Sequence, residues 1–197
     1  MTMTAADIAP PPLSVALAGN PNAGKSTLFN TLTGSRQHVG NWPGKTIEKK
    51  TGELHRGGRR IVVTDLPGAY SLSAYSMEEI ITRDFLLGER PDAVVIVADV
   101  TNLERNLYLV VQLLETGLPS VVVLNMMDVA EQQGLTVRVE RLRAVLAAPV
   151  VPAIARRGQG LEEIVAAACD VASGRGNTFR LDYGPEIERE IAILETA

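Results

Sequence analysis

The sequence predicts an α/β fold in which a mostly parallel, doubly wound sheet is flanked by helices. Short runs of β-branched residues alternate with segments whose apolar residues recur every three or four positions. The two central runs, residues 94–97 and 121–124, are apolar at every position. That pattern is typical of parallel strands covered on both faces. With 197 residues, 46% of them hydrophobic, the chain is long enough to bury one core of this kind.

The individual elements follow from these patterns. We expect strands at residues 13–18, 47–54, 60–64, 93–99, 120–125 and 150–154. We expect helices at residues 25–32, 77–87, 107–115, 139–146 and 161–172, where apolar residues repeat at helical spacing. The strict alternation of the two sets implies crossover connections and therefore a parallel sheet.

The domain organisation is read from proline, glycine and charge. Residues 1–12 end in three prolines and are expected to be a disordered leader. The α/β domain is expected to occupy residues 13–173, and a glycine-rich linker residues 174–184. Residues 185–197 open with a proline and carry a charged helical pattern with one apolar stripe. Since so short a helix cannot bury that stripe alone, we interpret it as the start of a truncated helical domain.

Composition excludes several classes of function. The chain has 23 acidic and 19 basic residues and a net charge of −4, which disfavours a protein that coats nucleic acid. A single cysteine, Cys169, excludes an internal disulfide and indicates a reducing compartment. The longest nearly apolar run, residues 144–155, contains two prolines and is too short for a membrane span. We therefore expect the fragment to be soluble.

A phosphate-binding loop is predicted at residues 19–26. Their sequence, GNPNAGKS, matches G-x-x-x-x-G-K-[ST] between a predicted strand and a predicted helix. Backbone N–H groups of such a loop surround the phosphates, the lysine adds positive charge, and the serine hydroxyl binds Mg²⁺. This motif predicts a P-loop NTPase. The nucleotide-binding residues expected here are Gly19, Asn22, Ala23, Gly24, Lys25, Ser26 and Thr27.

Two further segments are predicted to sense the γ-phosphate. Residues 65–68, DLPG, follow a strand, so that Asp65 is expected to hold Mg²⁺ through a water and Gly68 to contact the phosphate. Residues 40–46 form a polar loop in which Thr46 is the candidate to complete the Mg²⁺ shell. The alternative for Thr46 is a residue that only opens a strand. The sole tryptophan, Trp42, is either a packing anchor or an exposed contact.

The base end of the site is predicted at Asn125-Met126-Met127-Asp128. The Asp128 carboxylate can accept from N1–H and the exocyclic amine of guanine, a pair of donors that adenine lacks. We expect Asn125 to join this loop to the phosphate-binding loop and the Met126 side chain to cover the base. The alternative is a strand-ending Asn and a helix-capping Asp. In residues 152–158 the N–H of Ala155 is the expected donor to guanine O6.

Taken in order, these motifs are those of a small GTPase G-domain. The stretches GNPNAGKSTLFNTLTGSRQHVGNWPGKTIEKKTG, DLPGAYSLSAYSMEEIITRDFLL and VVVLNMMD closely resemble the cytosolic N-terminal domain of FeoB-type prokaryotic ferrous-iron transporters. The resemblance covers residues 13 to about 195. It implies a G-domain followed by a helical domain and a membrane permease, the last two being largely or wholly outside this chain. It also implies a place at the cytoplasmic face of the bacterial inner membrane.

The resemblance further implies GTP hydrolysis stimulated by K⁺. In that family an asparagine of the phosphate-binding loop helps to hold K⁺, and Asn22 stands at the matching position, with main-chain oxygens around residues 41–42 as further ligands. The chain departs from the family pattern at Ala23, Lys45 and Ile154. The catalytic residues expected are therefore Lys25, Thr46, Gly68 and Asn22, with GTP or GDP, Mg²⁺ and K⁺ as cofactors.

The sequence also suggests the rate of GTP hydrolysis, the partners of the domain and two alternative functions. The residue after the DLPG motif is Ala69, which has no side chain to orient the attacking water, so hydrolysis is expected to be slow. We expect the permease domain of the same full-length protein as partner, leave homo-oligomerisation open, and expect no nucleic-acid partner. Two other functions stay open: an RNA- or ribosome-associated assembly GTPase, and a nucleotide-dependent dimerisation module.

Overall fold

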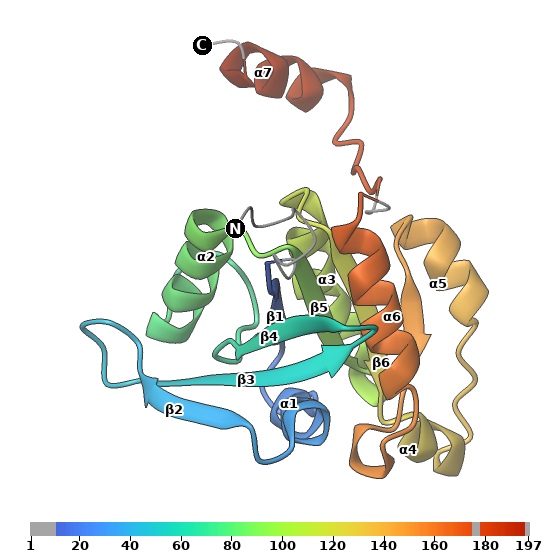
Figure 1. The fold of residues 1–197 in the computed structure, drawn as a ribbon. Helices are drawn as coiled ribbons and strands as arrows, with labels where there is room; N and C mark the ends of the chain where they lie inside the picture. Colours follow the sequence, from blue (N-terminus) through green and yellow to red (C-terminus); the bar gives the residue numbers. More distant parts are fainter. Residues whose placement is uncertain (1–10, 175–177, 196–197) are drawn as a thin grey trace, which may run out of the picture.

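The structure is a computed structural model that describes residues 11–174 and 178–195. Its sheet has seven strands in the order β2-β3-β4-β1-β5-β6-β7 (Figure 1). The strands are β1 Leu13–Gly19, β2 Gln37–Asn41, β3 Glu48–Arg56, β4 Arg59–Asp65, β5 Ala93–Asp99, β6 Ser120–Asn125 and β7 Val150–Pro152. The helices are α1 Lys25–Thr33, α2 Met77–Glu89, α3 Leu103–Glu115, α4 Met127–Gln132, α5 Val139–Leu146, α6 Leu161–Ala172 and α7 Pro185–Glu195.

The predicted doubly wound sheet is confirmed. Strand β1 pairs in parallel with β4 on one side and β5 on the other, and β6 and β7 continue the parallel series. The two-residue turn between β3 and β4 makes those strands antiparallel, and β2 pairs antiparallel with β3. All five parallel strands therefore end at one edge of the sheet, where the loops that carry the sequence motifs meet.

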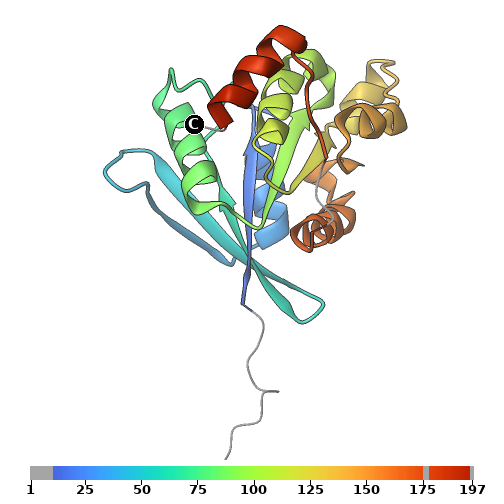
Figure 2. The same cartoon turned by 90° about the horizontal axis from the view of Figure 1, so that it is seen from above.

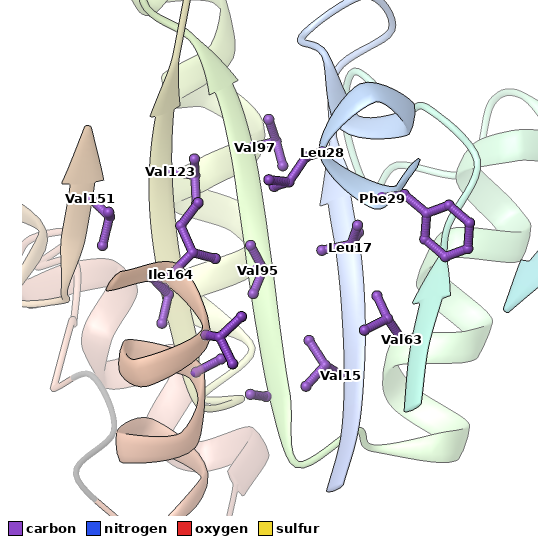
Figure 3. Close-up of a cluster of buried hydrophobic side chains, with 14 of the residues drawn as sticks. Val15, Leu17, Leu28, Phe29, Val63, Val95, Val97, Val123, Val151 and Ile164 are labelled. Atoms are coloured by element: carbon purple, nitrogen blue, oxygen red, sulfur yellow. The ribbon is translucent and has the colours of Figure 1, made fainter. Parts of the chain in front are cut away.

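Helices cover both faces of the sheet, as Figure 2 shows. On one face, α1 and α6 pack against alternate residues of the parallel strands, including Leu17, Val95 and Val123 (Figure 3). On the other face, α2, α3 and α5 cover the intervening residues, such as Val94 and Val122. The central strands β5 and β6 have no exposed residue, which explains why their sequences are apolar at every position.

The structure corrects the expected elements in two places. Strand β2 lies where the sequence assigns no element and overlaps the start of the loop expected at residues 40–46. It was missed because its residues are exposed or half-buried and show no alternation. Helix α4 was also missed, since six residues are too few to show a helical period. Other boundaries shift by a few residues: α3 begins at Leu103 rather than at 107, and β7 ends at Pro152 rather than at 154.

The C-terminal part is an extended segment followed by α7. Tyr183 donates its phenolic O–H to Glu115 of α3 at 2.6 Å, which ties the segment to the α/β domain. The start of a helix at Pro185 agrees with the sequence interpretation, while most of the expected leader, residues 1–10, lies outside the described residues. No helix in the described ranges is long and apolar enough to cross a membrane.

Trp42 is a packing anchor in the loop between β2 and β3. Its side chain is 6% exposed and meets Phe85 of α2 edge to face, with the ring centroids 5.5 Å apart. The ammonium group of Lys49 lies 4.7 Å from the centre of the Trp42 ring. The loop that precedes Thr46 is therefore fastened to α2 by one aromatic contact.

Replacement of this anchor is expected to destabilise the domain. Trp42→Ala removes a buried aromatic side chain and should lower the free energy of unfolding by about 3 kcal/mol, measured by urea denaturation followed by circular dichroism. Trp42→Phe is the matched control. Its cost should be smaller, since the ring contact is kept and the buried Trp42 Nε1 has no hydrogen-bond partner to lose. Equal stability of the Trp42→Ala variant and the unaltered chain would contradict the anchor.

Candidate functional site

The phosphate-binding loop lies between the end of β1 and the start of α1. Asn22 and Gly24 both have left-handed backbone, with φ values of 67° and 87°. Gly24 is required there for a second reason: a Cβ atom would collide with the side-chain amide of Asn125. Helix α1 has no side-chain cap, so the N–H groups of its first turn, which have no partner within a helix, are available to an anion.

Lys25 and Ser26 meet Asp65 from β4. The Lys25 ammonium lies 2.5 Å from one carboxylate oxygen of Asp65, and the Ser26 hydroxyl donates to the other at 3.2 Å. Lys25 and Asp65 are 8% and 7% exposed, so this ion pair is largely shielded from water. Asp65 lies 40 positions after Lys25 and 39 after Ser26 in the sequence. The parallel pairing of β1 with β4 brings the ends of these strands, and so the three residues, side by side. Three of the predicted phosphate and Mg²⁺ residues, Lys25, Ser26 and Asp65, are thus brought together.

The segment after Asp65 lies against the phosphate-binding loop. A Cβ atom on Gly68 would stand 3.2 Å from atoms of Pro21, so only glycine fits this approach without displacement. The N–H of Ala69 donates to the carbonyl of Gly19 at 3.2 Å. Ala69 is 1% exposed, and its methyl group cannot carry a proton or orient a water.

A cavity of about 900 Å³, which we call the phosphate-end cavity, opens over this loop. It is bounded on one side by the loop and α1 and on the other by the segment from Gly68 to Glu79. Asn22 lines it with an exposed side chain. Seven of the residues predicted from the sequence to bind the nucleotide or to act in catalysis line this cavity: Asn22, Gly24, Lys25, Ser26, Thr27, Gly68 and Met126.

The base end is built around Asn125 at the end of β6. Its side-chain N–H donates to the carbonyl of Ala23 at 2.9 Å, and its Oδ1 accepts from the N–H of Ala155 at 3.0 Å. Asn125 therefore joins the phosphate-binding loop to the loop after β7. Its contact with the phosphate-binding loop was expected from the sequence, and its contact with the loop after β7 was not. A neighbouring cavity of about 150 Å³, the base-end cavity, lies between Gly24, Met126 and Asp128.

Asp128 lies inside α4, whose N-cap is Met126, so the helix-capping alternative is not what the structure shows. The residue is 5% exposed. Its carboxylate accepts from the guanidinium group of Arg156, with Nε at 3.0 Å, and the Nε of Arg157 lies 3.9 Å away. The hydrogen bond from Arg156 holds the pKa of Asp128 below its ordinary value. Asp128 is therefore ionised at neutral pH and offers acceptor oxygens only.

The expected role of Ala155 needs a correction. Its N–H is already donated to Asn125, so it is not free for guanine O6. The next N–H along this loop is that of Arg156, which lines the same cavity. The sequence interpretation missed this because the side-chain acceptor at Asn125 becomes visible only when β6 and β7 are paired.

Thr46 is not brought to the site. It is exposed and lines neither the phosphate-end nor the base-end cavity. The loop that carries it projects from the edge of the sheet between β2 and β3 (Figure 1). The carbonyl of Trp42, an expected K⁺ ligand, accepts from the N–H of Lys45 at 2.9 Å. The roles of this loop toward Mg²⁺ and K⁺ stay predictions.

Glu79 is a residue of the site that the sequence interpretation missed. It is 7% exposed and accepts from the N–H and hydroxyl of Ser71 and from the N–H of Tyr75, each at 3.1 Å. With Ser76 it forms a capping box at the start of α2. The spacing S-x-x-E at residues 76–79 was the available signal. Burial would raise the pKa of Glu79, but the hydrogen bonds from Ser71, Ser76 and Tyr75 outweigh it and lower the pKa.

Known proteins are similar to this chain in sequence and in fold. The family described as ferrous iron transport protein B matches residues 13–168. The Fe(2+) transport protein A/Fe(2+) transporter FeoB fusion protein of Porphyromonas gingivalis is 46% identical over 186 residues, which are 92% of this chain and 22% of that protein. The Fe(2+) transporter FeoB of Escherichia coli K12 is 47% identical over 156 residues, which are 77% of this chain and 20% of that protein. The chain thus spans about a fifth of the length of these curated relatives.

A solved structure agrees with the sequence relatives. The cytosolic domain of the T. maritima FeoB iron transporter, in its GMPPNP form, superposes with a TM-score of 0.89 at 41% identity. The match covers 93% of this chain and 73% of that chain. The similarity extends over the whole α/β domain rather than over the motifs alone.

Neutralisation of Glu79 is expected to loosen the segment between Gly68 and α2. Because the folded-state pKa is lowered, the stabilisation by ionised Glu79 is present above the ordinary carboxyl pKa of 4.5 and is lost as the pH falls through the folded-state value. Glu79→Gln should therefore lower the free energy of unfolding at pH 7 by about 1–3 kcal/mol and with it the melting temperature. The difference from the unaltered chain should shrink only as the pH falls below 4.5. Differential scanning calorimetry between pH 3.5 and 7 measures this. Glu78→Gln is the control, and a pH-independent difference would contradict the ionised network.

Proposed function

Because the chain belongs to the ferrous iron transport protein B family, we propose that it binds GTP and GDP and hydrolyses GTP slowly, as a regulatory domain of ferrous-iron uptake. The observation that supports this most directly is the bridge through Asn125. One side chain fixes the phosphate-binding loop and the base-end loop relative to each other, with Asp128 facing the space between them. A nucleotide held at both ends is the ligand that such a pair of loops fits.

The choice of guanine rests on Asp128. Its ionised carboxylate is nine-tenths buried and has acceptor capacity for two parallel N–H donors. Guanine presents such a pair in N1–H and its exocyclic amine, whereas adenine offers no donor at N1. A buried acceptor left unpaired is costly, so this carboxylate selects against adenine nucleotides. The N–H of Arg156 is the donor we assign to guanine O6.

The donor set for Mg²⁺ fits the ion. The Ser26 hydroxyl and the Asp65 carboxylate lie side by side, 3.2 Å apart, and oxygen ligands with one carboxylate are what Mg²⁺ takes beside phosphates. Ser26 would bind the ion directly and Asp65 through a water, while Lys25, which pairs with Asp65 in the structure, would contact the phosphates. When bound, Mg²⁺ would neutralise charge on the β- and γ-phosphates.

K⁺ is assigned to Asn22. Its side chain carries an amide oxygen, is exposed, and lines the phosphate-end cavity, which are the properties of a ligand for a weakly held monovalent ion. When bound, K⁺ would supply positive charge that an arginine supplies in other GTPases. The slow rate follows from Ala69, whose methyl group leaves the attacking water to be positioned by backbone groups.

The place of the domain in a longer protein is part of the proposal. Since the chain spans about a fifth of its curated relatives, we assign the membrane permease to the remainder of the full-length protein and this domain to its cytoplasmic face. The alternative of an RNA-associated GTPase is disfavoured by the net charge of −4. Calorimetric titration with GDP, a GTP analogue and ATP in the presence of Mg²⁺ tests the ligand class. Heat with ATP but none with GDP would overturn the assignment.

The base assignment predicts a change of specificity. Asp128→Asn replaces an acceptor pair by one acceptor and one donor, which suits xanthine rather than guanine. We expect GDP affinity to fall at least about tenfold and xanthosine diphosphate to become the tighter ligand, measured by isothermal titration calorimetry. Asp84→Asn, a surface carboxylate on α2, should leave both affinities unchanged. An unchanged preference for GDP in Asp128→Asn would refute the base assignment.

The cation assignment predicts a separate loss. Asn22→Ala should abolish the stimulation of GTP hydrolysis by K⁺ over Na⁺ while GDP binding is largely kept, since the N–H groups of the loop remain. The left-handed backbone at residue 22 disfavours alanine by about 1–2 kcal/mol, so a small loss of GDP affinity is part of the expectation. Single-turnover hydrolysis in the two salts measures it. Asn30→Ala on the exposed face of α1 is the control. Stimulation by K⁺ that persists in Asn22→Ala would exclude Asn22 as a ligand.

A further inference from the structure

Arg156 stands at the one carboxylate that the proposed function assigns to guanine. Its Nε and Nη2 both donate to the same oxygen, Oδ2, of Asp128. The two partners differ in burial: the Asp128 side chain is 6% exposed and the Arg156 side chain 58% exposed. The carboxylate is therefore fixed in the wall of the base-end cavity, while the guanidinium reaches it from solvent.

The donors of Arg156 resemble those of the ligand. A guanidinium group presents two N–H bonds on nitrogens that share one carbon, and guanine presents the same arrangement at N1, C2 and the exocyclic amine. Both arrangements are matched to a carboxylate. Asp128 is the acceptor for either one, and the Arg156 side chain and the base would enter the same cavity of about 150 Å³.

We propose that Arg156 is an internal competitor of guanine, so that nucleotide binding requires its guanidinium to leave Asp128. The inference rests on the proposed function, and adds to it a residue that sets nucleotide affinity. Ala155 and Asn125 hold the backbone of this loop through an N–H to Oδ1 bond, so the Arg156 side chain can move without loss of the bridge. The apparent affinity is the intrinsic affinity multiplied by the fraction of molecules in which Asp128 is free.

The expected size of the effect is modest. An ion pair with one exposed partner is weak and is screened by salt. Removal of the competitor should therefore tighten GDP binding by about threefold to tenfold at low ionic strength, and by less at high ionic strength. ADP offers no donor pair to Asp128, so its binding should not tighten.

The test compares Arg156→Ala with Arg157→Ala. Both variants remove one positive charge from the same loop, but the Arg157 Nε lies 3.9 Å from Asp128 Oδ2 and makes no hydrogen bond to it. GDP and ADP are titrated calorimetrically into both variants and the unaltered chain, at 20 mM and 500 mM KCl, with Mg²⁺. Arg156→Lys, which keeps the charge but not the paired donors, should lie between Arg156→Ala and the unaltered chain.

The outcomes separate the two proposals. A gain in GDP affinity in Arg156→Ala that shrinks with salt, exceeds that of Arg157→Ala and is absent for ADP supports the competitor. Unchanged or weaker GDP binding in a folded Arg156→Ala protein overturns it, as does an equal gain in Arg157→Ala or for ADP. If the unaltered chain binds no guanine nucleotide at all, the proposed function fails instead. Thermal melts of each variant establish that it is folded.

Discussion

The side chain of Asn125 is the interaction on which the geometry of the site depends. It bonds to Ala23, 102 positions earlier in the sequence, at 2.9 Å, and to Ala155, 30 positions later, at 3.0 Å. Neither bonded partner belongs to the same strand or helix as Asn125. On the β7 side the bridge adds to backbone bonds from Ala153 N–H to Leu124 and from Met127 N–H to Ala153, and on the other side it reaches the phosphate-binding loop. The close approach also explains Gly24, because a Cβ atom there would occupy the space of the Asn125 amide. The Asn125 amide thus requires a glycine at position 24 of the phosphate-binding loop and accepts the N–H of Ala155 in the loop after β7.

The parallel sheet explains how much of the fold could be predicted from the sequence. Residues 94–97 and 121–124 are apolar throughout because helices cover both faces of the sheet. Such a run of apolar residues can be recognised within a few consecutive positions of the sequence. Strand β2 carries no such signal, since it lies at the edge, exposes most of its residues and pairs only with β3. Helix α4 is too short for a period to appear. Elements that contribute to the core were found, including the edge strand β7, whereas the exposed strand β2 and the six-residue helix α4 were not.

The candidate site divides in the same way. The residues of the phosphate and base motifs could be predicted because a contiguous motif gives both residue type and spacing. The pairing of Lys25 with Asp65, and the closure of Arg156 onto Asp128, depend on strand register and side-chain conformation, which spacing does not contain. The same limit explains the error at Ala155, whose donor was assigned to the ligand before its protein acceptor was known.

The segment from Pro67 to Ser76 is held differently from the phosphate-binding loop, and under the proposed function this difference bears on which part of the site responds to a nucleotide. The phosphate-binding loop continues directly from β1 into α1, whereas the segment is held by the backbone bond from Ala69 to Gly19 and by individual side chains. Thr82 donates to the carbonyl of Pro67 at 3.0 Å, Gln112 accepts from the N–H of Leu72 at 2.8 Å, and Glu79 accepts from Ser71 and Tyr75. Each of these bonds leads to α2 or α3. A contact between Gly68 and a phosphate therefore competes with a few hydrogen bonds rather than with a strand ladder, and any rearrangement is passed to those two helices. Under the proposed function, the phosphate-binding loop positions the nucleotide, and the segment from Pro67 to Ser76 is the part of the site that responds to it.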